Sequence, residues 1–397
     1  MKKTILSTLL LTATCFSGFA TEGSDEPEPS GFFTSMLNEA VASSMEAPNQ
    51  SAPAASVPDD NAYLRTMTYG RTVTDFVSAP KFGGYVIGKY NYNDKADDHG
   101  GKGFTQRLVR FYVDGTILND FAYRIQIQAN NASFHMKDFF VEWKKYPAFK
   151  VKVGQFKRAF GFENPMNPWD ISTGDYSLMT QYLTGHKDYL NSQGADASFN
   201  KTTGKYDALP NGGRDQGIQV QGDFLPVGAD KHNLIHYQVM VSNGSGINVD
   251  DNDGKKDLTG TLQFQPIKGL YIGAFGWMGA FRSNTGNHSR NRYAFGVKYD
   301  ANGYTFRSEY AHGQSDLGNA DAWYAIAAAP VNDWFRVSAQ YQQYRKDKTS
   351  EHAQTMYSFI PEFQLHKNLK LQLQYNYNTI GSDTKYNELW AELYFRF

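Results

Sequence analysis

The sequence predicts an all-β protein: a transmembrane antiparallel up-and-down β-barrel of sixteen strands with one long loop folded inward. Three observations favour this fold. Aromatic residues make up 15% of the 397 residues, and with 36 Gly they are typical of strands and tight turns. From Lys81 onward, segments of about ten residues alternate apolar and polar side chains. After residue 20, no stretch has the roughly 18 to 20 uninterrupted apolar residues of a spanning helix.

Residues 1–20 have the pattern of a secretory signal peptide. Lys2 and Lys3 precede an apolar run, and small residues lead to an expected cut near Ala20. A short membrane anchor is the alternative, but the apolar run is too short to span a bilayer. Cys15 is the only cysteine and lies within this segment, so no disulfide is expected in the mature chain.

Residues 21–75 are expected to form an acidic periplasmic extension rich in Pro, Ala and Ser. Up to residue 60 this extension carries eight acidic residues and no Lys or Arg. A segment of this composition has too little apolar surface to fold alone. A short helix over 32–45 is predicted within it, either as an oligomer-forming element or as part of a flexible tether. Residues 76–397 form the predicted barrel domain. From residue 61 onward, 37 basic against 32 acidic residues give a net charge of +5, which suits an anionic ligand or permeant.

Sixteen segments with a period of two residues follow one another, and an even number suits an up-and-down barrel. In one of them Phe121, Tyr123 and Ile125 alternate with polar or small residues. The segments lie near residues 81–92, 104–114, 120–130, 135–145, 148–157, 215–224, 233–243, 256–266, 269–281, 290–300, 303–313, 320–329, 333–345, 353–365, 368–379 and 386–397.

A soluble sandwich or β-helix is the alternative all-β fold. Such folds use strands of about five or six residues with an apolar inner face. Here one whole face of the longer strands carries Arg, Lys, Gln or Asn. Short turns also alternate with long polar loops, predicted at 93–103, 243–256 and 282–291. The barrel is therefore expected in the outer membrane of a Gram-negative-type cell.

The longest interruption of the strand pattern runs from Arg158 to Arg214, after the fifth strand. A loop of this length in a compact barrel calls for a functional explanation. We expect it to fold into the lumen, narrow the pore and set what passes. The alternative is an external loop that shields the surface on the lipopolysaccharide side.

Basic residues on the polar face form a candidate anion path. Rings of Arg or Lys attract anions in a narrow channel, and the Arg fork matches phosphate oxygens. Acidic residues on the same face, such as Asp114, Asp138 and Glu142, offer the alternative that each base pairs across strands to hold the wall. The pore-lining or anion-path candidates are Arg110, Arg124, Lys150, Lys152, Lys157, Arg158, Arg292, Lys298, Arg307 and Arg336.

Several segments resemble the phosphate-selective porin O and P family over most of residues 81–397. They include "RLVRFYVDGTILNDFAYRIQIQ", "KDFFVEWKKYPAFKVKVGQFKRAFGFENP", "GRDQGIQVQGDF" and the final "ELYFRF", and the stretch Gly154–Lys157 is the most specific. The resemblance implies a sixteen-stranded trimeric porin whose constriction loop follows that stretch. It also implies that Arg110 corresponds to a lumenal arginine of the family's second strand. Lys157 corresponds to the lysine that ends the motif Gly154–Lys157, and both would line an anion path.

The expected function is passive diffusion of small hydrophilic solutes, with a bias to anions such as phosphate or polyphosphate. A surface adhesin or structural barrel with a plugged pore is the alternative. The sequence has no motif for a catalytic nucleophile, no paired metal-ligand spacing and no phosphate-binding loop, so no enzyme activity, metal or cofactor is expected. The acidic loop at 250–257 lacks EF-hand spacing, which leaves a solvated loop or a surface calcium bridge.

The expected partners follow from this fold. They are outer-membrane lipid and lipopolysaccharide, small anionic solutes and further copies of the chain in a homotrimer, without nucleic acid. The last strand ends on Phe397, which resembles the C-terminal signal of barrels folded by the outer-membrane insertion machinery.

Overall fold

The computed structural model describes residues 78–95, 102–130, 133–186, 197–200, 205–208, 213–283, 286–347 and 353–397. The predicted signal peptide, the acidic extension with its helix over 32–45, and parts of the Arg158–Arg214 insert lie outside these ranges.

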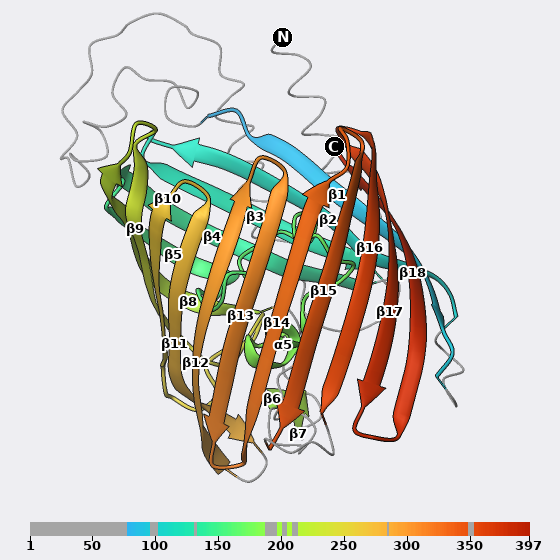
Figure 1. Ribbon diagram of the computed structural model, residues 1–397. Coiled ribbons are helices and arrows are strands. Elements are labelled where there is room, and N and C mark those ends of the chain that lie inside the picture. The colour runs from blue at the N-terminus through green and yellow to red at the C-terminus, as the bar shows by residue number, and fades with distance from the viewer. Residues whose placement is uncertain are drawn as a thin grey trace, which may run out of the picture. The chain divides into compact units, whose positions relative to one another are not determined.

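Sixteen antiparallel strands form one closed barrel, which confirms the predicted fold (Figure 1). Each strand pairs with its neighbours in the chain, β5 lies beside β8 across the long insert, and β1 closes on β18. The strands are β1 Lys81–Asn93, β2 Gly103–Ile117, β3 Phe121–Asn130, β4 Ser133–Tyr146, β5 Phe149–Lys157, β8 Arg214–Val227, β9 His232–Ser242, β10 Asp257–Ile267, β11 Leu270–Ser283, β12 Gly286–Ala301, β13 Tyr304–Ser315, β14 Gly318–Pro330, β15 Phe335–Lys346, β16 Gln354–His366, β17 Leu369–Ile380 and β18 Thr384–Arg396.

The insert between β5 and β8 contains the remaining elements. The helix α5, Leu178–Leu183, begins at Ser177, whose side chain accepts a hydrogen bond from the backbone N–H of Thr180. The strands β6, Ala197–Asn200, and β7, Lys205–Ala208, form a separate two-stranded sheet. In the part of the chain that the structure describes, no helix is long and apolar enough to cross a membrane.

Side chains on the barrel strands alternate as the period-2 pattern predicts. The outer face carries exposed apolar residues, such as Ile218, Leu262 and Phe295, while Gln126 and Gln372 are buried on the inner face. A polar interior and an apolar exterior suit a barrel in lipid, where closure also leaves no unpaired strand edge.

The prediction of a long loop at 282–291 is wrong. Strand β11 extends into this stretch to Ser283 and strand β12 begins at Gly286, with Phe281 opposite His288 and Ser283 opposite Gly286. The polar residues of this stretch suggested a loop, but beyond the hydrocarbon region a strand needs no apolar face. The backbone ladder satisfies its hydrogen bonds without one.

One end of the barrel carries only short connections. Those from β2 to β3, β4 to β5, β8 to β9, β10 to β11, β12 to β13, β14 to β15 and β16 to β17 have two to four residues. The start of β1 and the end of β18 lie at this same end, because the strands are antiparallel. We call it the short-turn end, and in outer-membrane barrels such turns face the periplasm.

The last residue completes the seam between β1 and β18. Phe397 exchanges two backbone hydrogen bonds with Gly84, with N···O distances of 3.0 and 3.1 Å. Its ring also packs on Phe111, with ring centroids 5.9 Å apart. A Cβ on Gly84 would lie 2.6 Å from the Phe397 ring, so glycine is required for this close approach.

Deletion of Phe397 should lower the amount of assembled barrel, because it removes two seam hydrogen bonds and the ring contact on Phe111. The measurement is the yield of the heat-modifiable form on SDS gels of outer-membrane fractions. Phe397→Tyr keeps both features and is the matched control. Equal yields of the deletion and the control would contradict a role for the residue in closure or insertion.

Candidate functional site: the barrel interior and its inner segment

Residues 158–186, which we call the inner segment, cross the interior of the barrel. The backbone N–H of Leu178 donates to Gln342 on β15, and that of Gly174 donates to Gln374 on β17, both at 2.7 Å. The carbonyl of Ala159 accepts from Thr261 on β10. A segment that reaches well-separated strands through their polar inner-face side chains lies inside the closed barrel, where Figure 1 also shows α5.

A buried charge cluster fastens the first turn of the inner segment to β13. Arg307 lies 3.2 Å from the Glu163 carboxylate and donates to the Tyr324 hydroxyl at 2.9 Å. Glu309 accepts from the backbone N–H groups of Phe162 and Glu163 at 2.6 and 3.1 Å, and also from Tyr324. All three charges are fully buried. Removing one partner would leave a buried charge uncompensated, so the cluster fixes the path of the chain.

The approach of Gly161 to this cluster is close. Its φ of +78° lies in the left-handed region, and a Cβ there would be 2.9 Å from the Glu309 carboxylate. Gly174 comes similarly near the wall, since its Cβ would lie 2.7 Å from the Trp390 ring. Glycine at both positions therefore allows the segment to lie directly on the strands.

An apolar cluster supports the segment between these polar contacts. Phe160 and Phe162 pack edge-on against Phe275 of β11, and Met179 and Leu183 of α5 belong to the same buried cluster. The helix contacts β13, β14 and β15. The interior along these strands is therefore filled.

Two further contacts hold the segment at the short-turn end. The Lys370 ammonium donates to the carbonyl of Trp169 at 2.7 Å, and Arg336 donates to the Ser172 hydroxyl at 3.0 Å. On β2, Arg107 lies 3.4 Å from Asp175 and 3.2 Å from Glu392 of β18. The segment is thus anchored along the β10–β18 wall and to β2.

The opposite part of the interior holds a group of basic side chains. Arg110, Arg124, Lys157 and Arg214, with Asp138 as the one acidic residue, line a cavity of about 80 Å³ beside the inner segment. Arg214 pairs with Asp138 at 2.7 Å, and Arg124 pairs with Asp114 at 2.7 Å. Among the described residues, Arg110 donates hydrogen bonds to two neutral groups, Gln128 and the Tyr85 hydroxyl, each at 2.8 Å.

In the described part of the chain, Lys157 and Lys137 also form no ion pair with a carboxylate. The Lys157 ammonium donates to the Met166 carbonyl and, at 2.9 Å, to the Tyr176 hydroxyl. Lys137 is 7% exposed and interacts electrostatically with Arg110, Arg214 and Asp138. Among the described residues no hydrogen bond or ion pair reaches its ammonium group. We call Arg110, Lys137 and Lys157 the basic cluster.

His186 of the inner segment is buried near this cluster. Burial, together with Lys157 and Arg214, lowers the pKa of His186 well below its usual range. Its Nε2 lies 2.9 Å from the Asn164 side-chain oxygen. The imidazole is therefore neutral, because burial disfavours its charged form and the nearby positive charges add to this effect.

Sequence reasoning missed Lys137 and Arg107 because strict alternation places them on the outer face. In the structure a register shift occurs at each residue, between Gln126 and Ile127 opposite Lys137, and between Ile87 and Gly88 opposite Arg107. A β-bulge adds one residue to a strand and re-aims its side chains. The two consecutive charges Lys137 and Asp138 were the one available signal of such a break.

The other predicted site residues are each in contact with neighbouring side chains. Lys150 pairs with Asp223 at 2.9 Å and Lys152 with Glu142 at 3.6 Å, so the wall neutralises both. Arg158 forms a buried ion pair with Asp215 at 2.8 Å. The guanidinium groups of Arg158 and Arg292 both lie over the Trp277 ring. Lys298 lies 4.3 Å from the centre of the Tyr271 ring. Arg307 and Arg336 anchor the inner segment as described.

Among the described residues, no group of three or more His, Cys, Asp or Glu side chains could hold a metal ion. Asp257, at the end of the acidic loop, is buried and accepts from Trp277 and Arg290 at 2.8 and 2.9 Å. In the same loop, hydrogen bonds from Lys256 lower the pKa of Asp251, against a weaker effect of burial. Both carboxylates are therefore engaged within the protein.

A closed sixteen-stranded barrel with a polar interior and an inward segment defines the class of outer-membrane channels for small solutes. Residues 41–382 match the family described as Gram-negative porin, and the chain belongs to that family. It is therefore a channel protein rather than an enzyme. No curated protein sequence matches the chain.

Solved structures share the fold at low sequence identity. The anion-selective porin from Comamonas acidovorans has a TM-score of 0.59 at 13% identity, covering 80% of this chain and 99% of that one. The trimer form of OmpT from Vibrio cholerae has a TM-score of 0.53 at 14% identity, with the same coverage. The outer membrane channel DcaP of Acinetobacter baumannii has a TM-score of 0.56 at 12% identity, covering 83% and 99%.

Arg307→Ala should loosen the inner segment, because it leaves Glu163 and Glu309 buried without a cation. We expect a loss of about 3–5 kcal/mol in stability and a larger, noisier single-channel conductance. Thermal unfolding in detergent and planar-bilayer recordings measure the two effects.

The matched control is Arg345→Ala, whose side chain is exposed and lies 3.7 Å from Asp321. Its loss should cost no more than about 1 kcal/mol and leave the conductance unchanged. Equal behaviour of the two variants would contradict the anchoring role of Arg307.

Proposed function

We propose that this porin is a passive diffusion channel for small hydrophilic solutes with a bias to anions such as phosphate or polyphosphate. The observation that carries the proposal is the basic cluster. Arg110, Lys137 and Lys157 meet beside the inner segment, and no carboxylate pairs with any of them among the described residues. Most other candidate bases have an acidic partner within 4 Å.

Unpaired buried cations are costly unless an anion compensates them. A permeating anion would supply that compensation at the place where the inner segment narrows the interior. The Arg110 guanidinium offers a planar fork for oxyanions, and the two lysines add charge without fixed geometry. Several modest contacts suit transport better than one tight pocket, since a permeant must also leave.

The paired bases have a weaker role in this proposal. Arg124, Lys150 and Lys152 line the same wall, but Asp114, Asp223 and Glu142 offset their charges. Lys298 borders two cavities on the other side of the inner segment and extends the anion path. Arg158, Arg292 and Arg307 are covered by protein and support the constriction without facing solute.

A plugged barrel that acts as an adhesin is the second candidate. The apolar cluster that fills the interior along β11–β14 favours it. Liposome swelling with a small neutral solute separates the two functions. A diffusion channel admits the solute and swells the vesicles, whereas a plugged barrel gives no swelling.

The proposal includes the surroundings of the barrel. Cleavage near Ala20 would release the chain into the periplasm, the insertion machinery would bind its Phe397 end, and lipid and lipopolysaccharide would cover the apolar exterior. A homotrimer is the proposed assembly, and the trimer form of OmpT, which shares the fold, supports it.

Arg110→Gln combined with Lys137→Gln should reduce the preference for anions. Loss of two charges near a permeating anion removes about 1–2 kcal/mol of attraction, a factor of roughly 5 to 30 in the permeability ratio of chloride to potassium. The zero-current potential under a salt gradient measures this ratio. Lys144→Gln, an exposed lysine at the short-turn end, is the matched control. An unchanged potential in the double variant would rule out the basic cluster as the filter.

A further inference from the structure

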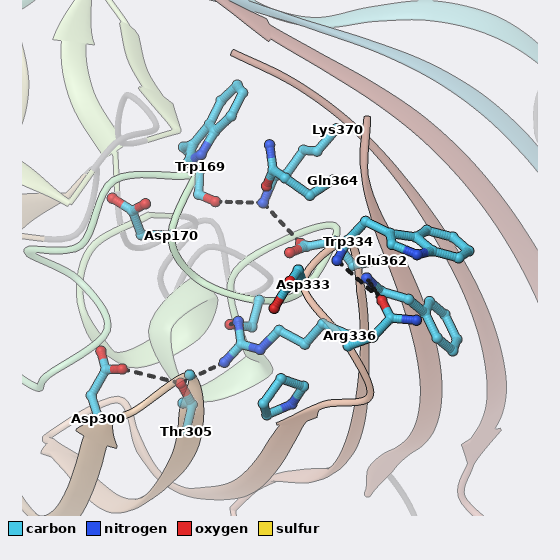
Figure 2. A pocket seen from close by; sticks show the side chains of 15 residues that line it. Trp169, Asp170, Asp300, Thr305, Asp333, Trp334, Arg336, Glu362, Gln364 and Lys370 are labelled. Atoms are coloured by element: carbon cyan, nitrogen blue, oxygen red, sulfur yellow. Dashed lines mark hydrogen bonds and ion pairs between the residues drawn. The ribbon is translucent and has the colours of Figure 1, made fainter. Parts of the chain in front are cut away.

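A second cavity, of about 430 Å³, lies at the short-turn end between the inner segment and β12–β17 (Figure 2). Three aspartates line the cavity: Asp170 of the inner segment, Asp300 of β12 and Asp333 of the turn before β15. Arg336, Glu362 and Lys370 complete its charged lining. The cavity is large enough for a small organic molecule.

Two of the carboxylates are free to bind a ligand. Asp170 and Asp333 are exposed to the cavity, and neither has a hydrogen bond or ion pair to its side chain among the described residues. Within the described ranges, the Asp300 carboxylate accepts one hydrogen bond, from the Thr305 hydroxyl at 3.3 Å. Burial raises the pKa of Asp170. Among the nearby charges, Lys370 and Arg396 lower this pKa, and the smaller effects of Asp300 and Glu362 raise it.

The bases of the cavity differ in availability. Lys370 is neutralised by Glu362 at 2.9 Å and also holds the Trp169 carbonyl. Arg336 donates to the hydroxyls of Ser172 and Thr305, at 3.0 and 2.6 Å. No carboxylate within the described residues forms an ion pair with Arg336. Three acidic groups and one unpaired guanidinium therefore face the same space.

We propose that this cavity is a binding subsite for the ammonium group of amine-bearing solutes, and that Arg336 receives the carboxylate when the solute is an amino acid. This inference rests on the proposed channel function and names a class of solute for it. Asp170 of the inner segment and Asp333 of the turn before β15 supply charge-assisted acceptors, and Arg336 of β15 supplies donors. The site thus has the opposite sign to the basic cluster, so a solute that carries both charges would find one site for each.

The spacing and size of the cavity favour an organic cation over a metal ion. Its carboxylates come from the inner segment, β12 and a turn, and no metal-binding group of three acidic side chains is present in the described part of the chain. An ammonium group can be bound by separated acceptors, because its three donors need no fixed coordination sphere.

The test is single-channel recording in planar bilayers with solute added on the short-turn side. The probes are 1,4-diaminobutane, which carries only ammonium groups, and 4-aminobutyrate, which also carries a carboxylate. Both should interrupt the ion current of the wild-type channel in a concentration-dependent way. Asp170→Asn combined with Asp333→Asn should raise the half-blocking concentration of both probes about tenfold. Arg336→Gln should weaken the block by 4-aminobutyrate alone.

Asp120→Asn is the matched control, since this acidic residue lies at the short-turn end in the β2–β3 turn, outside the cavity. It should leave both half-blocking concentrations unchanged. Block that is unaffected in the double variant, or equally reduced in the control, would overturn the subsite. Open channels in salt without any block by either probe would overturn the subsite alone, whereas absence of any channel current would overturn the proposed function.

Discussion

The organisation of the interior depends on the buried contact of Arg307 with Glu163, backed by Glu309 and Tyr324. A segment that leaves the wall at the end of β5 could otherwise extend outside the barrel. Glu309 satisfies the backbone N–H groups of Phe162 and Glu163, and Arg307 balances the carboxylate charges. Because buried charges tolerate little displacement, this cluster fixes the first turn of the inner segment. The contacts of Lys370 and Arg336 and the apolar packing of α5 hold the rest.

With the segment fastened to the β10–β18 wall, one cavity remains beside it along β1–β5 and β8, and another remains along β12–β17 at the short-turn end. The charges divide accordingly. The basic cluster contacts the inner segment through the hydrogen bond from Lys157 to Tyr176. The cavity at the short-turn end has more carboxylates than bases in its lining. Most remaining charges are neutralised across strands, so a few unpaired groups dominate the interior electrostatics. This separation of signs links the proposed anion bias to the proposed amine subsite.

Much of the fold could be predicted because period-2 alternation, turn residues and an even strand number all reflect one constraint, the pairing of every strand in lipid. The inner segment was expected from its length, but its anchors were not, because Glu163, Gln342 and Gln374 join residues far apart in the chain. Lys137 and Arg107 escaped prediction for a different reason. A single bulge reverses which face a side chain takes, and no residue type marks it uniquely.

Cysteine accessibility tests the division of the interior most directly, since Cys15 is the only cysteine of the chain. Gln238 lines a cavity of about 210 Å³ beside Gly161 and Phe162, whereas Gln342 is buried under α5. Each is replaced by cysteine, and a small cationic methanethiosulfonate reagent is added during single-channel recording. The structure predicts a stepwise fall in current for Gln238→Cys and none for Gln342→Cys. Equal and rapid modification of both positions would contradict an inner segment fastened to the β10–β18 wall.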